Sequence, residues 1–148
     1  MMNICFICTG NTCRSPLAEG ILKAKQLKGV SVRSAGVYAT DGAPISNHSR
    51  CLLEEYGMPV TPTSRRFTKQ DLEWADLILT MTVSHRDTLR RAFADRADKI
   101  VTLKEYVGSA EFDVQDPYGG NFGVYQQTFE ELSDQIDVLA RKLMGEQR

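Results

Sequence analysis

A cysteine and an arginine stand close together near the start of the chain, within a stretch that suits a tight loop. The stretch consists of Cys8, Thr9, Gly10, Asn11, Thr12, Cys13, Arg14 and Ser15. An apolar run precedes it and a helix-like segment follows, so it is expected to join the end of a strand to the start of a helix. In such a loop, successive backbone N–H groups point inward and the helix dipole adds positive potential. The spacing therefore predicts a phosphate-binding loop.

The residue types of this loop suggest a specific chemistry. Gly10 permits the tight turn because it has no Cβ. Arg14 can hold two phosphate oxygens at once, and the same positive field favours the thiolate of Cys8, which is the nucleophilic form of the side chain. Ser15 can donate a hydrogen bond to that thiolate. We therefore expect Cys8 to attack phosphorus at the floor of the loop.

A structural role for Cys8 is the alternative. Free cysteines usually pack in protein cores, so Cys8 could be the last buried residue of the strand that the apolar run 2–7 predicts. Short motifs also arise by chance. The order of the neighbouring features favours catalysis, because Arg14 and Ser15 are followed by Pro16, which suits the first turn of a helix.

Size and composition indicate one domain. The chain has 148 residues, of which 42% are hydrophobic, an ordinary fraction for a protein with a packed core. Its net charge of −1 argues against a nucleic-acid partner, because such proteins carry an excess of clustered Lys and Arg. The N-terminus lacks the features of a signal peptide, and no stretch is apolar for long enough to span a bilayer. We therefore expect a cytoplasmic protein without a membrane partner.

Four cysteines, at positions 5, 8, 13 and 51, raise the question of disulfides or zinc. A reducing cytoplasm disfavours structural disulfides. Cys5 and Cys8 have the CxxC spacing, but residues three apart in a strand face opposite sides, and no second pair or histidine pair completes a zinc site. We expect no metal and no cofactor, and we interpret Cys5 as a buried strand residue.

Apolar runs alternate with segments of helical periodicity along the chain. The runs near 3–7, 30–34, 76–81 and 99–103 predict strands, and helices are expected near 15–28, 44–57, 82–96 and 122–145. A further short helix should begin at Thr68, with Asp71 as its capping partner. This alternation predicts one α/β domain with a parallel sheet covered on both faces. The apolar stripe of the last helix is interpreted as core packing.

A leaving group expelled by Cys8 must receive a proton, and Asp116 is the best candidate to supply it. Asp116 opens the sequence Asp-Pro-Tyr-Gly-Gly, which is also ordinary turn chemistry, so the residue types leave a structural role equally open. Asp113, three residues earlier, is the second candidate for the acid.

Four motifs make the chain similar to the low-molecular-weight protein tyrosine phosphatase family along nearly its whole length. They are residues 8–15, 33–36 (Arg-Ser-Ala-Gly), 76–81 (Asp-Leu-Ile-Leu-Thr-Met) and 116–120 (Asp-Pro-Tyr-Gly-Gly). The resemblance implies one phosphatase domain over residues 1–148, with a four-stranded parallel sheet of order 2-1-3-4 and helices on both faces. It places the loop at the switch point of the sheet, where ligands bind. It also implies that Asp116, rather than Asp113, is the general acid.

The resemblance implies a mechanism in two steps without a metal. Cys8 attacks phosphorus in line, while Arg14 and the loop amides hold the equatorial oxygens and Asp116 protonates the leaving atom. Asp116 then activates a water molecule, which releases phosphate from the phosphocysteine. In some members the cysteine equivalent to Cys13 closes reversibly onto the nucleophile and protects it from further oxidation. Asn11 resembles the asparagine that braces the loop, and Ser34 is expected in the same network.

The pocket walls bear on the choice of substrate. In tyrosine-specific members, position 12 is commonly a branched aliphatic residue, and two aromatic residues follow Asp-Pro. Here Thr12 and Gly119 occupy two of these positions, which resembles the bacterial protein-arginine phosphatases more closely. A hydroxyl suits a polar guanidinium, and Tyr118 can lie against its planar face. We therefore expect arginine-phosphorylated proteins as substrates, with tyrosine-phosphorylated proteins as the alternative, although Thr12 could also be a neutral loop residue.

Two other functions fit these residues less well. Thiol-coupled arsenate reductases need further cysteines downstream of the loop, and none follows Cys51. A module that only binds phosphopeptides needs neither Cys8 nor Asp116.

The remaining polar residues receive structural interpretations. His48 and His85 are interpreted as surface or packing residues. Arg86, Arg90 and Arg91 are interpreted as a solvated helix face.

Overall fold

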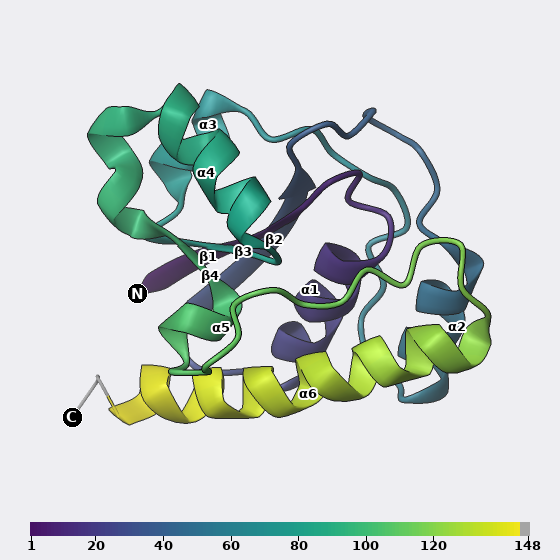
Figure 1. Cartoon of the computed structure of the whole chain (residues 1–148). Coiled ribbons are helices and arrows are strands. Elements are labelled where there is room, and N and C mark those ends of the chain that lie inside the picture. Colours follow the sequence, from purple (N-terminus) through teal and green to yellow (C-terminus); the bar gives the residue numbers. More distant parts are fainter. Residues whose placement is uncertain (146–148) are drawn as a thin grey trace.

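Four parallel strands form one sheet (Figure 1). Their order is β2-β1-β3-β4, which confirms the expected topology. The computed structural model describes residues 1–145, and the last three residues of the expected domain, 146–148, lie outside this described part. The strands are β1 (Met2–Cys8), β2 (Val30–Gly36), β3 (Leu77–Thr80) and β4 (Ile100–Thr102). Because all four run in the same direction, their carboxyl ends meet at one edge of the sheet, where the loop after β1 begins.

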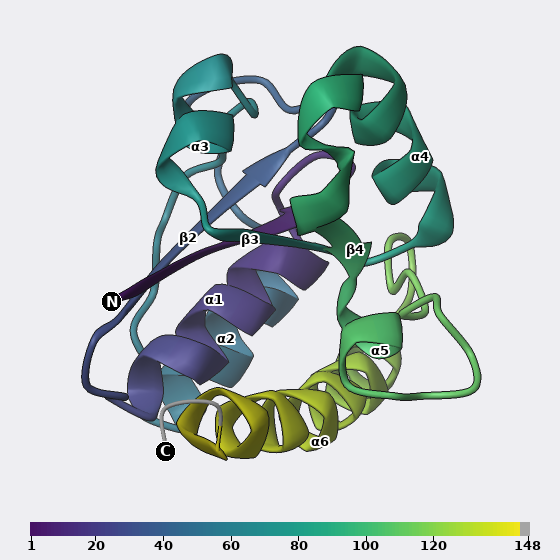
Figure 2. The same ribbon diagram turned by 90° about the vertical axis from the view of Figure 1, so that its left-hand side faces the viewer.

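Helices cover both faces of this sheet, which confirms the expected α/β architecture (Figure 2). One face carries α1 (Arg14–Ala24), α2 (Asn47–Glu55), α5 (Leu103–Tyr106) and the long α6 (Phe122–Gly145). The other face carries α3 (Lys69–Trp74) and α4 (Val83–Ala92), and the 3-10 helix η1 (Ala94–Lys99) leads from α4 to β4. Among residues 1–145, no helix combines the length and the apolar character needed to cross a membrane.

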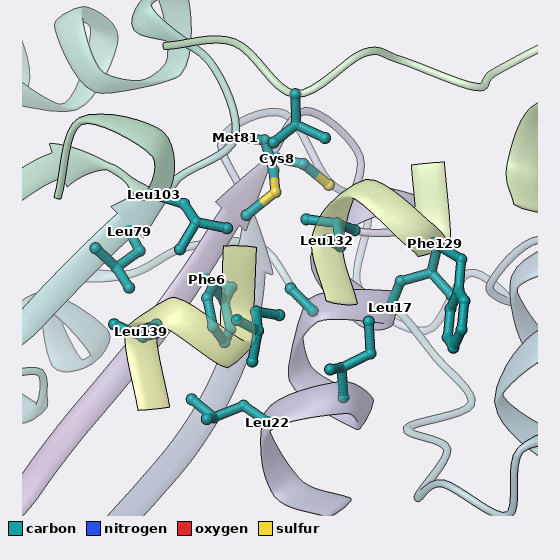
Figure 3. Packing of buried hydrophobic residues seen from close by; sticks show 14 of the residues in the cluster. Phe6, Cys8, Leu17, Leu22, Leu79, Met81, Leu103, Phe129, Leu132 and Leu139 are labelled. Atoms are coloured by element: carbon teal, nitrogen blue, oxygen red, sulfur yellow. The ribbon is translucent and has the colours of Figure 1, made fainter. Parts of the chain in front are cut away.

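Side chains of β1 alternate between two hydrophobic cores, as the period of a strand requires. Phe6 and Cys8 point to the core beneath α1 and α6, where they meet Leu17 and Leu132 (Figure 3). Cys5 points to the opposite core, beneath α3 and α4. Burial raises the pKa of the Cys5 thiol above its ordinary value, so this cysteine remains a neutral core residue, as expected.

The apolar stripe of α6 packs against the sheet and α1. Its buried members are Tyr125, Phe129, Leu132, Ile136, Leu139 and Leu143. The stripe follows helical spacing along the full length of α6, and the core packing expected for it is confirmed.

The end of β2 contacts the loop after β1 very closely. Gly36 pairs with Cys8 in the parallel register, and the N–H of Tyr38 donates to the carbonyl oxygen of Thr9 at 2.9 Å. A Cβ placed at Gly36 would lie only 2.5 Å from that same carbonyl oxygen. The absent side chain of Gly36 therefore allows the loop to lie against the strand end.

Several helices are shorter than expected because local features end them. α1 stops before Gln26, which adopts a left-handed conformation with φ 49°. α2 begins only after Ser46, whose hydroxyl accepts a hydrogen bond from Ser49 N and caps the helix. The expected helix 82–96 divides at Phe93, whose φ of −132° and ψ of 59° are not helical. α3 begins after Thr68, with the expected capping box to Asp71.

Two of the three arginines interpreted as a solvated helix face bind other elements instead. Arg86 donates from one guanidinium nitrogen to both carboxylate oxygens of Glu105, each at 3.0 Å. Arg90 Nε donates to the carbonyl oxygen of Ile100 at 2.8 Å, which ties α4 to β4. Only Arg91 is exposed as expected. The interpretation was wrong for Arg86 because α5, which carries Glu105, was not predicted. It was wrong for Arg90 because its partner is a backbone carbonyl of β4, which no pattern of charged residues indicates.

Candidate active site

A pocket of about 260 Å³ opens at the carboxyl end of β1. Its lining consists of Cys8, Thr9, Gly10, Thr12, Cys13, Arg14, Asp116 and Tyr118. Residues 8–14 form one continuous stretch from the last residue of β1 to the first residue of α1, whereas Asp116 and Tyr118 come from the segment between α5 and α6. The fold therefore brings together two stretches of sequence that lie about a hundred residues apart.

A chain of two hydrogen bonds, from Asn11 to Ser15 and from Ser15 to the sulfur, ends at Cys8. Ser15 Oγ lies 2.8 Å from Cys8 Sγ, and Asn11 Nδ2 lies 2.7 Å from Ser15 Oγ. An amide nitrogen can only donate, so the hydroxyl of Ser15 accepts from Asn11 and its own hydrogen is available to the sulfur. This arrangement suits a thiolate at Cys8, because the thiolate is an acceptor.

Asn11 holds the loop in a shape that few residue types adopt. Its φ is +55°, in the left-handed region that asparagine tolerates better than most side chains. The side chain also donates to Ser34 Oγ at 2.9 Å, and it accepts a hydrogen bond from the backbone N–H of Arg65 at 2.9 Å. Asn11 therefore links the loop to the end of β2 and to the segment that follows α2.

Glu19 extends this network, and the sequence interpretation missed it. Its carboxylate accepts hydrogen bonds from Ser34 Oγ and Thr61 Oγ1 and forms an ion pair with Lys23. The residue is only 4% exposed, although glutamate in a helix is usually solvated. Because the hydroxyl of Ser34 donates its hydrogen to Glu19, its oxygen is the acceptor for the hydrogen bond from Asn11.

Arg14 is buried with its guanidinium beside the pocket. Nη1 donates to the carbonyl oxygen of Val114 at 3.0 Å, and Nη2 lies 3.6 Å from Asp116 Oδ2. These contacts leave further N–H groups of the guanidinium free to bind an anion. Val114 was not identified from the sequence. It binds Arg14 through its backbone carbonyl, which every residue type has, and it lies 100 residues further along the chain.

The two candidate acids occupy different places. Asp116 lines the pocket with a half-exposed carboxylate, whose Oδ1 accepts from Tyr118 N at 3.0 Å. Asp113 instead accepts from the backbone N–H of Val83, at 2.8 Å, and so holds the start of α4. Asp113 does not line the pocket. The geometry therefore favours Asp116 as the group that can reach a leaving atom.

His85 is not simply a surface or packing residue. Its ring is buried, and Nε2 lies 2.7 Å from the hydroxyl of Thr9 in the loop. Burial and the positive charge of Arg14 lower the pKa of His85 to about 4, so the ring is neutral at neutral pH. His48 does pack as expected, with its ring centroid 4.9 Å from that of Tyr125.

The pocket gathers several groups that can act on a phosphoryl group. Within the described residues, no group of three or more His, Cys, Asp or Glu side chains is placed to hold a metal ion. The pocket contains the sulfur of Cys8, the guanidinium of Arg14 and the carboxylate of Asp116. This combination can bind a phosphoryl group and transfer it to sulfur.

Sequence comparison places this geometry in a known family. The model described as low molecular weight phosphotyrosine protein phosphatase matches residues 3–148. The chain belongs to this family. The family recognised from the loop and the three downstream motifs is thereby confirmed.

Relatives in the low molecular weight phosphatase family carry two kinds of name. A protein-arginine-phosphatase of Geobacillus stearothermophilus is 44% identical over 144 residues, which cover 97% of each chain. The low molecular weight protein-tyrosine-phosphatase PtpB of Staphylococcus epidermidis is 42% identical over 141 residues, covering 95% of this chain and 99% of the relative.

A solved structure of another relative bears on the covalent step. It is described as YwlE arginine phosphatase, a cysteine-to-serine mutant with a phosphorylated active site serine. It has a TM-score of 0.92 and 40% identity to this chain, covering 97% of this chain and 96% of that one. In that protein, the serine that replaces a cysteine therefore carries a phosphoryl group.

Cys13 lies next to a tyrosine hydroxyl in this member of the low molecular weight phosphatase family. Tyr125 OH is 3.3 Å from Cys13 Sγ, and both cysteines of the loop are free thiols. Burial and the contact with Cys13 raise the pKa of Tyr125 to about 12, so its hydroxyl stays protonated and can donate to the sulfur. Tyr125 thus helps to hold the side chain of Cys13 in its place in the loop.

We expect mild peroxide to inactivate the protein in a form that a thiol reductant restores. Peroxide converts the Cys8 thiolate to a sulfenic acid, and attack by Cys13 then forms a disulfide and releases water. Mass spectrometry after partial oxidation should find the Cys8–Cys13 link. Cys13→Ser should recover less activity after the same treatment, whereas Cys51→Ser should recover like the wild type. Equal recovery in all three proteins would remove Cys13 from this scheme.

Proposed function

We propose that the chain hydrolyses phosphoarginine in proteins through a phosphocysteine intermediate. The observation that carries the proposal is the convergence of Cys8, Arg14 and Asp116 on one pocket whose wall includes the hydroxyl-bearing Thr12 and the aromatic ring of Tyr118. The first three residues supply the phosphoryl chemistry. The last two distinguish the substrates.

The first step transfers the phosphoryl group to sulfur. The Cys8 thiolate attacks phosphorus, an S–P bond forms, and the bond from phosphorus to the guanidino nitrogen of the substrate breaks. Arg14 and the loop amides hold the oxygens on which negative charge is distributed. Asp116 delivers its proton to the departing nitrogen, which leaves as part of a neutral guanidine and then takes up a proton from water.

The second step releases phosphate and restores the enzyme. Asp116, now ionised, takes a proton from a water molecule that attacks phosphorus, and the S–P bond breaks. Cys8 leaves as a thiolate, which the hydroxyl of Ser15, 2.8 Å away, stabilises by donating a hydrogen bond. The phosphorylated active site serine of the YwlE mutant, a relative with the same fold, supports a covalent step of this kind.

The pocket wall supports a guanidino substrate. The Thr12 hydroxyl can bond to the planar guanidino group, and the ring of Tyr118, which is 80% exposed, is free to lie against its face. Gly119 does not line the pocket. Its φ of +81° would strain any larger residue, so the backbone of this turn accounts for its small size. The protein-arginine-phosphatase name of a 44% identical relative supports the same substrate class.

Hydrolysis of phosphotyrosine in proteins is the second candidate. The PtpB relative, at 42% identity, is named a protein-tyrosine-phosphatase. The deciding experiment compares kcat/KM of the purified protein on three peptides of one sequence that carry phosphoarginine, phosphotyrosine or phosphoserine. We expect the order phosphoarginine, phosphotyrosine, phosphoserine. A higher value for phosphotyrosine than for phosphoarginine would reverse the assignment.

Thr12→Ile should shift the preference of the pocket toward phosphotyrosine. The substitution replaces the hydroxyl that favours a guanidino group with an apolar wall that suits a phenyl ring. We expect the ratio of the two kcat/KM values to change by about 10–200-fold, the usual effect of one altered pocket contact. Thr12→Ser, which keeps the hydroxyl, is the matched control and should stay near the wild-type ratio. An unchanged ratio in Thr12→Ile would show that Thr12 does not select the substrate.

A further inference from the structure

One histidine joins the helix after β3 to the phosphate-binding loop. His85 lies in the first turn of α4, where its backbone N–H donates to the hydroxyl of Thr82 at 3.2 Å. Its ring extends from this turn to Thr9, the residue that directly follows Cys8, and Nε2 lies 2.7 Å from Thr9 Oγ1. The His85 residue is only 6% exposed, so water has little access to the ring.

The surroundings of the ring indicate which nitrogen carries the proton. The pKa of His85 is lowered to about 4 by burial and by Arg14, against the opposing charges of Asp116 and Asp113, so the ring has one N–H at neutral pH. Nδ1 is buried without a hydrogen-bond partner anywhere in the described chain. A buried N–H without a partner is rare and unfavourable. The tautomer protonated on Nε2 avoids this situation, and in it the ring donates to Thr9.

The direction of this hydrogen bond determines where the Thr9 hydroxyl can donate. Because Thr9 Oγ1 accepts from His85, its own hydrogen is not used in that bond. In the part of the chain that the structure describes, Thr9 makes no second side-chain hydrogen bond. Thr9 lines the same pocket as Cys8 and Arg14. Its hydroxyl is thus a donor placed beside the phosphoryl site, and a phosphoryl group has several oxygens that accept.

We propose that His85 is a positioning residue that holds the Thr9 hydroxyl so that it donates to the phosphoryl group bound in the pocket. This inference rests on the proposed phosphatase function. It concerns the phosphoryl end of the substrate rather than the leaving group, so it applies equally to phosphoarginine and phosphotyrosine. Thr9 is then a binding residue, and His85 acts through it without touching the substrate.

A double-mutant cycle tests this link. Thr9→Val removes the hydroxyl with little change in shape, and His85→Leu removes the ring donor. We expect each variant to lower kcat/KM by about tenfold, the loss of one hydrogen bond to a charged group. If His85 acts only through Thr9, the double variant should be no less active than Thr9→Val alone. Losses that multiply, or a fully active Thr9→Val protein, would overturn the proposal.

Conservative variants separate positioning from a merely structural role. His85→Gln places an amide N–H near the position of Nε2 and should recover most of the activity, whereas His85→Asn is too short to reach Thr9 and should remain impaired. Thr9→Ser should likewise remain active. These variants keep the test decisive even if His85→Leu does not fold. Thr88→Val, which removes a hydroxyl elsewhere on α4, should leave activity unchanged.

Binding of inorganic phosphate distinguishes a failure of this inference from a failure of the proposed function. Isothermal titration calorimetry should show about tenfold weaker phosphate binding to Thr9→Val and His85→Leu than to the wild type and His85→Gln. A wild-type protein that binds phosphate but hydrolyses no phosphopeptide would refute the proposed function, while the affinities would still test the Thr9 hydroxyl. Equal affinities in all four proteins would overturn the role of His85.

Discussion

Cys8→Ser should abolish turnover, because a serine hydroxyl is a far weaker nucleophile than a cysteine thiolate. An alkoxide is also a poorer leaving group than a thiolate, so any phosphoryl group that reaches the introduced serine should stay there. We therefore expect steady-state hydrolysis to fall to background. Intact-protein mass spectrometry after incubation with a phosphopeptide should show the gain of one phosphoryl group.

The control for this substitution is Cys51→Ser. Cys51 is the exposed cysteine, on α2, and it does not line the pocket, so its replacement should leave kcat/KM unchanged. Phosphate binding should survive in Cys8→Ser, since Arg14 and the loop amides remain in place. Substantial residual hydrolysis by Cys8→Ser, or turnover that depends on an added divalent metal, would contradict a covalent mechanism at Cys8.

Asp116→Asn should lower kcat on phosphoarginine by about 10²–10⁴-fold, the range for loss of a general acid or base. An amide cannot deliver the proton that the departing nitrogen needs, nor can it activate water in the second step. The amide oxygen can still accept the hydrogen bond from Tyr118 N, so the loop around residue 116 should keep its shape. With p-nitrophenyl phosphate, whose leaving group departs without a proton, Asp116→Asn should lower the rate of the first step by a smaller factor. Rapid-mixing measurements of the first turnover check this.

Asp113→Asn is the matched control. An asparagine at this position keeps an acceptor for the backbone N–H of Val83, so the start of α4 and the catalytic rate should both be retained. If Asp113→Asn proved the more damaging of the two substitutions, the acid would have been assigned to the wrong residue.

The sequence was sufficient for a parallel sheet because β1, β3 and β4 are mostly apolar and buried, a pattern typical of strands covered on both faces. The order of the strands was implied by the family resemblance. The sequence was insufficient for α5, whose four residues are too few for any helical period to emerge. That omission also explains the error on Arg86, since a run of charged residues on one helix gives no indication of a carboxylate partner on another. Charge alone predicts solvation, whereas the ion pair with Glu105 is set by tertiary packing.

The pocket residues were predictable where their types and spacing carry the chemistry, as in the loop from Cys8 to Ser15. The supporting residues were not. Glu19 resembles any solvated residue of an amphipathic helix, and His85 contacts a residue 76 positions away. Only the folded chain brings such groups to the loop, because a supporting hydrogen bond depends on direction and distance rather than on residue type.

The bonds around Asn11 have a further consequence for the energetics of binding. They join the loop to β2 and to the segment that carries Arg65, and every partner in them belongs to the protein itself. The backbone of the loop is therefore held in shape by the fold, so little of its conformational entropy is lost when a substrate binds. The reorganisation energy of the transition state is correspondingly small, because dipoles fixed by the fold need not turn as charge moves from sulfur to the phosphoryl oxygens. The loop loses this conformational entropy when the chain folds and the left-handed turn at Asn11 forms, not when a substrate binds.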